Sequence, residues 1–242
     1  MQMPLKTLVI LPAYNEEQSI KQTLLAISQI LPQADLLVIN DGSIDRTTAS
    51  AREAGAIVLE LPYNVGIGAA VQTGFIYAAR YQYDLVIRND GDGQHQPDNL
   101  PECIALFETE KLDVLIGSRF LNREGDYGTS MPRKLGIRIL TTLLSTITHQ
   151  SVTDPTSGFG LYNRRAIALF SRLYPHDYPE PEAIVMMHRA GLRWKETPIR
   201  MQARQYGTSS FQNPFRSAYY MVKVVLAILV NLLRKKPDFE LE

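Results

Sequence analysis

The sequence predicts an α/β fold in which helices flank a mainly parallel, Rossmann-like sheet. Short apolar runs alternate with helix patterns over the first 120 residues. This alternation is typical of parallel strands joined by right-handed crossover helices. The 242 residues, 45% of them hydrophobic, are enough for one domain with a large core. We expect one domain over residues 1–213 and a C-terminal amphipathic helix with its tail over residues 214–242.

The first strand, Thr7–Leu11, is an apolar run that Pro12 closes, and Ser19 is a candidate N-cap of a helix that extends to Ile30. The following segments repeat this alternation of strand and helix. The expected strands are Asp35–Asn40, Ala56–Leu61, Asp84–Arg88 and Val114–Gly117, and the expected helices are Asp45–Ala54, Gly66–Tyr81 and Pro97–Glu110.

The pattern changes after residue 120, where a polar loop precedes a long helix with few charges. The expected order is loop Asn122–Pro132, helix Lys134–His149, a loop and then a strand in Thr153–Tyr162, strand Trp194–Met201, loop Ala203–Asn213 and helix Phe215–Lys236.

Composition excludes several classes of function. The 25 basic and 25 acidic residues give zero net charge, so no nucleic-acid-binding surface is indicated. The single cysteine, Cys103, excludes an intrachain disulfide and a cysteine metal site, and we expect a buried thiol. The four histidines lack metal-ligand spacing. Residues 1–6 lead directly into a strand without a cleavage site, so we expect a cytoplasmic protein.

Polar residues gather where the predicted strands end. Because ligands of open parallel sheets bind beyond the carboxyl ends of the strands, we expect a site at this edge. The contributing segments are Tyr14–Glu17, Asp41–Ser43, Asn64–Gly68, Asp90–Gln94 and Ser118–Arg119.

Asp90 and Asp92 are the most informative pair, because they follow an apolar strand and are one residue apart. Carboxylates held in this way suit a hard divalent cation that also binds substrate phosphates. The alternative is an ordinary turn with solvated carboxylates, which Gly91 and Gly93 also fit.

The order of these motifs resembles that of family 2 glycosyltransferases with the GT-A fold, in particular the polyprenol-phosphate branch, which is similar to dolichol-phosphate mannosyltransferase. The resemblance covers about residues 5–212. It depends on seven motifs, namely Pro12–Glu17, Asn40–Thr47, Asn64–Gly68, Asp90–Gln94, Gly117–Arg119, Asp154–Phe159 and Arg204–Ser210.

The resemblance implies a role for each motif. Mg²⁺ or Mn²⁺ would be held by Asp90, Asp92 and Gln94 and would neutralise the leaving diphosphate. The implied catalytic residues are Asp92, Arg119, Glu182 and Arg204, and the implied acceptor-binding residues are Arg133 and Ser157. The nucleotide-sugar would contact Pro12, Ala13, Tyr14, Glu16, Asp41, Asn64, Gly66, Gly68, Asp90 and Gly91.

Three positions leave alternatives open. The family often has a lysine where Ile67 stands, so one charge contact is missing. A dinucleotide fold is disfavoured, because Val71 occupies the third glycine position of its motif. Glu182, in a segment that also contains Asp177 and Glu180, is either a base or an acceptor-orienting group, or else an acidic residue that caps a helix.

The helix over residues 215–236 has one narrow polar stripe, and its longest uncharged run, Val224–Leu233, is too short to span a bilayer. It is either an interfacial helix, with Arg234 among the basic residues that would favour anionic lipid, or a core or oligomer-interface helix.

These features predict an inverting glycosyltransferase that moves a sugar from a nucleotide-diphosphate sugar to a polyprenyl phosphate at the cytoplasmic membrane surface. The protein would associate with the membrane peripherally, alone, as a homo-oligomer or with a small membrane-protein partner. Two alternatives remain, namely a transferase with a hydroxyl acceptor on a growing glycan and a non-catalytic subunit that binds nucleotide-sugar.

Overall fold

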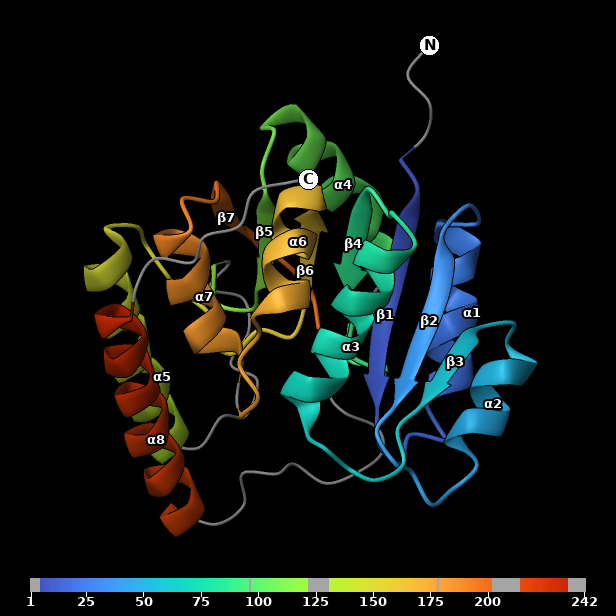
Figure 1. Ribbon diagram of the computed structural model, residues 1–242, viewed down its shortest axis with the longest axis horizontal. Coiled ribbons are helices and arrows are strands. Elements are labelled where there is room, and N and C mark those ends of the chain that lie inside the picture. The colour runs from blue at the N-terminus through green and yellow to red at the C-terminus, as the bar shows by residue number, and fades with distance from the viewer. Residues whose placement is uncertain (1–4, 96, 122–130, 178, 202–213, 235–242) are drawn as a thin grey trace.

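The computed structural model describes residues 5–95, 97–121, 131–177, 179–201 and 214–234. A seven-stranded sheet, in the order β3-β2-β1-β4-β6-β5-β7, forms its centre (Figure 1). Only β6 runs antiparallel to its neighbours, β4 and β5, among the described strands, which confirms the mainly parallel α/β prediction. The strands are β1 (Thr7–Ala13), β2 (Asp35–Asn40), β3 (Ile57–Glu60), β4 (Leu85–Arg88), β5 (Val114–Ser118), β6 (Gly160–Asn163) and β7 (Trp194–Pro198).

The six predicted helices are present in the predicted order, and the described residues form two further helices, α6 and α7, that were not predicted. Helix α6 was not expected from the sequence, although Asn163 caps it by accepting a hydrogen bond from the backbone N of Ala166 at 3.1 Å. Ser19 stands at the N-cap of the first helix, but its side chain makes no capping bond. The helices are α1 (Ile20–Ile30), α2 (Thr47–Glu53), α3 (Ile67–Arg80), α4 (Leu100–Thr109, after a 3₁₀ turn at Pro97–Asn99), α5 (Met131–Thr148), α6 (Arg164–Arg172), α7 (Pro179–Arg189) and α8 (Pro214–Leu233).

Two hydrophobic cores lie on opposite faces of the sheet, because successive strand residues point to opposite sides. Ile10 belongs to the core that contains Phe75 of α3 and the buried residues of α6. Its neighbour Val9 belongs to the core that contains Leu24 of α1 and Cys103 of α4. Burial raises the pKa of the Cys103 thiol to about 11, as expected for a structural cysteine.

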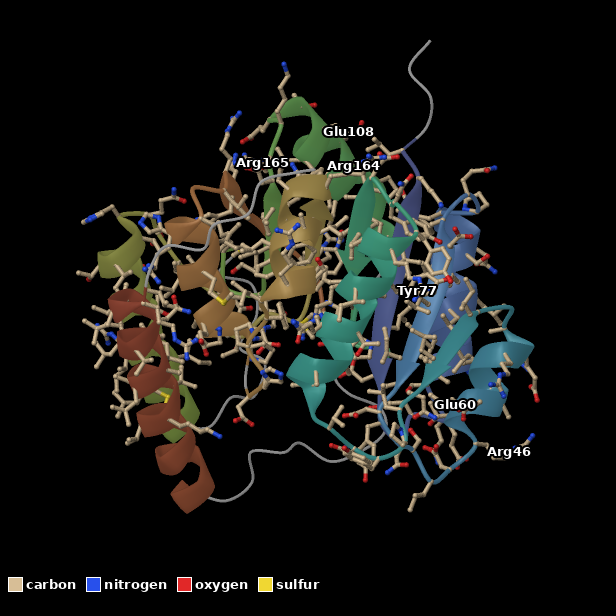
Figure 2. The ribbon with its side chains drawn as sticks, viewed as in Figure 1. Arg46, Glu60, Tyr77, Glu108, Arg164 and Arg165 are labelled. Carbon is tan, nitrogen blue, oxygen red and sulfur yellow. The ribbon has the colours of Figure 1, made fainter. Side chains whose placement is uncertain are left out.

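The parallel strands end at the edge that lies at the bottom of Figure 1. Figure 2 shows Glu60, at the end of β3, near this edge, and Arg46 close to it. Arg164 and Arg165, at the start of α6, lie at the opposite edge together with Glu108. Because α6 returns toward the lower edge, the segment after it and the first turn of α7 reach the carboxyl ends of the strands.

Helix α8 presents its apolar side outward and part of its polar stripe inward. Lys223 forms an ion pair with Asp177, and Asn231 accepts a hydrogen bond from Arg189 of α7 at 3.0 Å. In the described part of the chain no helix is both long and apolar enough to cross a bilayer. The exposed apolar residues of α8 are Val222, Leu226, Leu229, Val230, Leu232 and Leu233, and those of the adjacent α5 are Leu135 and Ile139.

Candidate active site

The loops that follow β1 and β2 are joined by backbone-to-side-chain hydrogen bonds. Asn15 adopts a left-handed conformation with φ 56°, and its backbone N donates to Ser43 Oγ at 2.9 Å. The backbone N of Glu16 donates to Thr47 Oγ1 at 2.9 Å. Tyr14 is about half exposed, whereas Pro12 and Ala13 belong to the buried end of β1. The structure thus brings the four predicted nucleotide-binding residues of this loop to the carboxyl edge.

Asp41 fixes the glycine turn that leads into α3. Its buried carboxylate accepts hydrogen bonds from the backbone N of Val65 at 2.8 Å and of Gly66 at 3.0 Å. Gly42, with φ +71°, approaches Tyr63 so closely that a Cβ would lie 2.5 Å from its carbonyl carbon. Asp41 therefore positions the turn, and its contact with a base or ribose stays a prediction.

The glycines of this turn are required by the protein's own backbone. Gly66 has a φ of +96°, which side chains rarely adopt. A Cβ on Gly68 would lie 2.2 Å from the carbonyl oxygens of Pro175 and His176. The backbone that Gly68 approaches closely therefore belongs to the segment before α7, and contacts of Asn64, Gly66 and Gly68 with a ligand stay predictions.

Asp90 and Asp92 lie on a tight turn directly after β4. The Asp90 side chain is 32% exposed, and its Oδ2 lies 3.7 Å from His95 Nε2. Asp92 Oδ1 accepts a hydrogen bond from the backbone N of Gln94 at 3.1 Å, so the three predicted metal ligands share one turn. Ser19 Oγ donates to the carbonyl oxygen of Gly91 at 3.0 Å and thereby ties this turn to the loop after β1.

The environment of Asp90 keeps it ionised. Burial alone would raise the pKa of the carboxyl group. The nearby His95 imidazole and the positive charges of Arg88 and Arg119 outweigh burial and lower the pKa to about 2. A permanently ionised carboxylate that is one third exposed is a suitable partner for a divalent cation.

The donor set fits a cation that is shared with substrate. Among the described residues, no three His, Cys, Asp or Glu side chains converge as a complete metal site. Mg²⁺ and Mn²⁺ commonly bind through one or two carboxylates, with substrate phosphates and water as the other ligands. Asp90 and Asp92 supply this minimal pair.

Arg88 is a site residue that the sequence analysis did not include. It is 2% exposed, and its Nη2 lies 2.6 Å from Glu180 Oε1 and 3.8 Å from Asp90 Oδ1. Its Nη1 donates to the hydroxyl of Tyr174 at 3.0 Å. Burial would lower the pKa of Arg88, but these neighbours raise it well above the usual value. The signal in the sequence was a charged residue at the end of an otherwise apolar strand.

Glu180, rather than Glu182, is the carboxylate of α7 beside this centre. Both belong to the first turn of α7. Glu180 contacts Arg88, whereas Glu182 accepts from Asn231 Nδ2 at 3.4 Å and lines a groove of about 510 Å³ between α7 and α8. Glu180 is therefore the one of these two carboxylates that contacts Arg88, and the role of Glu182 as a base or an acceptor-orienting group stays a prediction.

Arg119, at the end of β5, is used mainly inside the protein. Its Nε and Nη2 each lie 2.7 Å from a carboxylate oxygen of Asp154, which is fully buried, and Nη2 also donates to Thr156 Oγ1 at 2.6 Å. This pair fixes the loop before β6, in which Ser157 lines a cavity of about 20 Å³ together with Arg88 and Glu180. A contact of Arg119 with phosphate stays a prediction.

Two predicted residues cannot be placed in this site. Arg204 lies outside the described residues. Arg133 belongs to the first turn of α5, but its side chain is outside the described part of the structure.

Comparisons with known proteins identify the family. The model of the family described as glycosyl transferase family 2 matches residues 8–170. An undecaprenyl-phosphate mannosyltransferase of Micrococcus luteus is 30% identical over 85% of this chain and 87% of its own length. A polyprenol monophosphomannose synthase of Mycolicibacterium smegmatis is 28% identical over 90% of this chain and 85% of its own length.

Solved structures show the same fold. A glucosyl-3-phosphoglycerate synthase from Mycobacterium tuberculosis, crystallised with phosphoglyceric acid, has a TM-score of 0.72 at 21% identity over 97% of this chain and 81% of that chain. Another crystal of that enzyme, with a TM-score of 0.69 at 20% identity and the same coverage, contains Mn²⁺, UDP and glucosyl-3-phosphoglycerate. The fold is thus that of GT-A glycosyltransferases, and the chain belongs to glycosyl transferase family 2.

Proposed function

We propose that this protein transfers a sugar from a nucleotide-diphosphate sugar to a polyprenyl phosphate. The observation that carries the proposal is the pair of carboxylates, Asp90 and Asp92, on the turn after β4 at the carboxyl edge of the sheet, where the loops after β1, β2 and β3 also meet. The names of the similar mannosyltransferase and synthase support the acceptor class. The crystal of a related fold with Mn²⁺ and UDP supports a divalent cofactor, Mg²⁺ or Mn²⁺.

In the proposed reaction, the acceptor phosphate oxygen attacks the anomeric carbon as the bond to the diphosphate breaks, so the configuration inverts. Asp90 and Asp92 would hold the cation, which offsets the charge that grows on the leaving diphosphate. The loop with Tyr14 and the turn held by Asp41 would bind the nucleotide. Because a phosphate acceptor is already an anion, no proton has to be removed from it.

A thermal-shift panel tests the donor site. We expect one of UDP-, GDP-, dTDP- and CDP-linked sugars to raise the melting temperature, and more strongly with Mn²⁺ than without it, because a ligand that binds only the folded state stabilises it. The free nucleoside without the diphosphate is the matched control. If no nucleotide-sugar shifts the melting temperature of the folded protein, with or without Mn²⁺, the catalytic proposal fails in favour of a non-catalytic role.

A hydroxyl acceptor is the second candidate, because Glu180 provides a carboxylate near the centre. With a prenyl phosphate acceptor, we expect Glu180→Gln to reduce kcat by less than about tenfold, since no base is needed. With a hydroxyl acceptor that the protein glycosylates, a loss of about a hundredfold or more in Glu180→Gln would indicate that Glu180 is the base. Glu108→Gln on α4 is the control, because Glu108 is exposed and lies at the opposite edge of the sheet (Figure 2), and we expect its kcat to stay near that of the wild type.

We also propose that residues 214–242 and α5 bring the protein to the cytoplasmic membrane surface. The supporting observation is the outward apolar side of α8, with Leu226 at 55% exposure. Burying such a side chain in the interface is favourable by about 1.5–3 kcal/mol. We therefore expect the protein to float with liposomes that contain anionic lipid, and Leu226→Asp to reduce the bound fraction about tenfold.

Leu25→Asp on α1 is the matched control for flotation, because Leu25 is 45% exposed and lies far from α8. It should float like the wild type. The membrane proposal fails if the wild-type protein stays in the aqueous fraction. If it also forms dimers that Leu226→Asp dissociates, the partner of the apolar side of α8 is a second copy of the chain.

A further inference from the structure

Arg88 joins two carboxylates that come from different parts of the chain. Asp90 follows β4, and Glu180 belongs to the first turn of α7. The guanidinium of Arg88 lies between them, at 2.6 Å from Glu180 and 3.8 Å from Asp90, and it is nearly inaccessible to solvent. The Glu180 side chain is still 18% exposed, so it is the partly open end of this buried pair.

The formal charges of this centre match one divalent cation. Arg119 and Asp154 form an ion pair, so together they add no net charge. Among the described side chains of this turn and its Arg88 pair, Asp90, Asp92 and Glu180 carry three negative charges and Arg88 offsets one of them, which leaves a formal charge of minus two. A bound Mg²⁺ or Mn²⁺ would bring the centre to neutrality. Without Arg88, the metal-loaded centre would remain negative.

We propose that Arg88 is a positioning residue that neutralises Glu180 and thereby allows an anionic acceptor to approach the metal-loaded centre. The inference rests on the proposed function, and it names a residue on which binding of the phosphate acceptor depends. Uncompensated charge matters here because the interaction energy of two charges is inversely proportional to the effective dielectric constant, so it is larger inside a protein than in water. The short bond between Arg88 and Glu180 also fixes the direction of that carboxylate.

The test uses Arg88→Met with a short-chain prenyl phosphate as acceptor and with Mn²⁺ binding followed by electron paramagnetic resonance. We expect the KM for the prenyl phosphate to rise about tenfold or more, because one positive charge is lost next to the acceptor. We expect the KM for the nucleotide-sugar to change by less than about threefold, because the donor is neutralised mainly by the metal. Mn²⁺ should bind the variant at least as tightly as the wild type, since a neighbouring cation has been removed.

The double variant Arg88→Met/Glu180→Gln restores the original charge of the centre. Its KM for the prenyl phosphate should return to within about threefold of the wild type. Arg88→Lys keeps the positive charge, so its KM for the prenyl phosphate should also stay within about threefold of the wild type. The double variant also removes the unpaired carboxylate that endangers folding of Arg88→Met. Thermal melting of each variant separates loss of fold from loss of acceptor binding.

Some results would overturn the inference without affecting the proposed function. One is an unchanged acceptor KM in folded Arg88→Met. Another is a double variant that stays as impaired as Arg88→Met or is worse, which would indicate that Arg88 only supports the fold. Weaker Mn²⁺ binding in Arg88→Met would indicate that Arg88 acts through Asp90. If the wild type transfers no sugar to a prenyl phosphate, the proposed function itself fails.

Discussion

Asp92→Asn is expected to reduce sugar transfer by about a hundredfold or more while the fold remains intact, because the amide no longer balances the charge of the cation that stabilises the leaving diphosphate. Asp92 is half-buried on the turn after β4, and its Oδ1 accepts from the backbone N of Gln94. The shape of the side chain is preserved, so the turn should persist. Steady-state transfer and Mn²⁺ affinity are the measurements, and both should fall.

Asp98→Asn is the matched control for this prediction, because Asp98 is an exposed carboxylate on the same segment, in the 3₁₀ turn before α4. Its activity should equal that of the wild type. Full transferase activity in a folded Asp92→Asn variant would refute the metal-binding role of Asp92.

The largest effect on stability is expected from Arg119→Met. The substitution leaves the Asp154 carboxylate, which has no solvent exposure, without its bidentate partner. Breaking a buried ion pair by removing one partner costs about 3–5 kcal/mol. We expect the free energy of unfolding, measured by urea denaturation, to fall by about that amount, and the melting temperature to fall with it.

Arg164→Met provides the contrast, because the Arg164–Asp84 pair has a similar length, 2.7 Å, but an Arg side chain that is 60% exposed. Figure 2 shows Arg164 at the outer end of α6. Exposed pairs contribute about 0–1 kcal/mol, so this variant should be nearly as stable as the wild type. Equal destabilisation by both substitutions would show that burial is not what makes the Arg119 pair important.

The elements of the first 120 residues could be predicted from the sequence because each buries apolar residues with a simple period. Strand β1 places Val9 and Ile10 in different cores, and α3 begins where the glycine turn predicts. Helix α6 is absent from the predicted elements, although Asn163 is a typical N-cap residue. Its pattern is short, and the strand before it has only four residues.

The loops that form the candidate site could be predicted from the sequence, but the pairs of side chains that contact each other within it could not. The carboxyl ends of parallel strands must meet at one edge, so Asp41 and Asp90 were expected near each other. Nothing in the sequence shows that Arg119 pairs with Asp154, or that Arg88 reaches Glu180 and not Glu182. These choices depend on the direction in which each side chain leaves its loop, and long-range packing determines that direction.

Strand β6 has a consequence for how the chain is made. Leu161 pairs with Ile87 of β4 on one side and with Leu115 of β5 on the other. During synthesis, β4 and β5 therefore leave the ribosome with unpaired backbone edges, and they stay so until the segment near residue 160 follows. Open edges of apolar strands are prone to aberrant pairing, and such non-local contacts form slowly. The nascent chain thus passes through an interval in which the loops after β1 to β5 have been synthesised but β4 and β5 are not yet joined by β6.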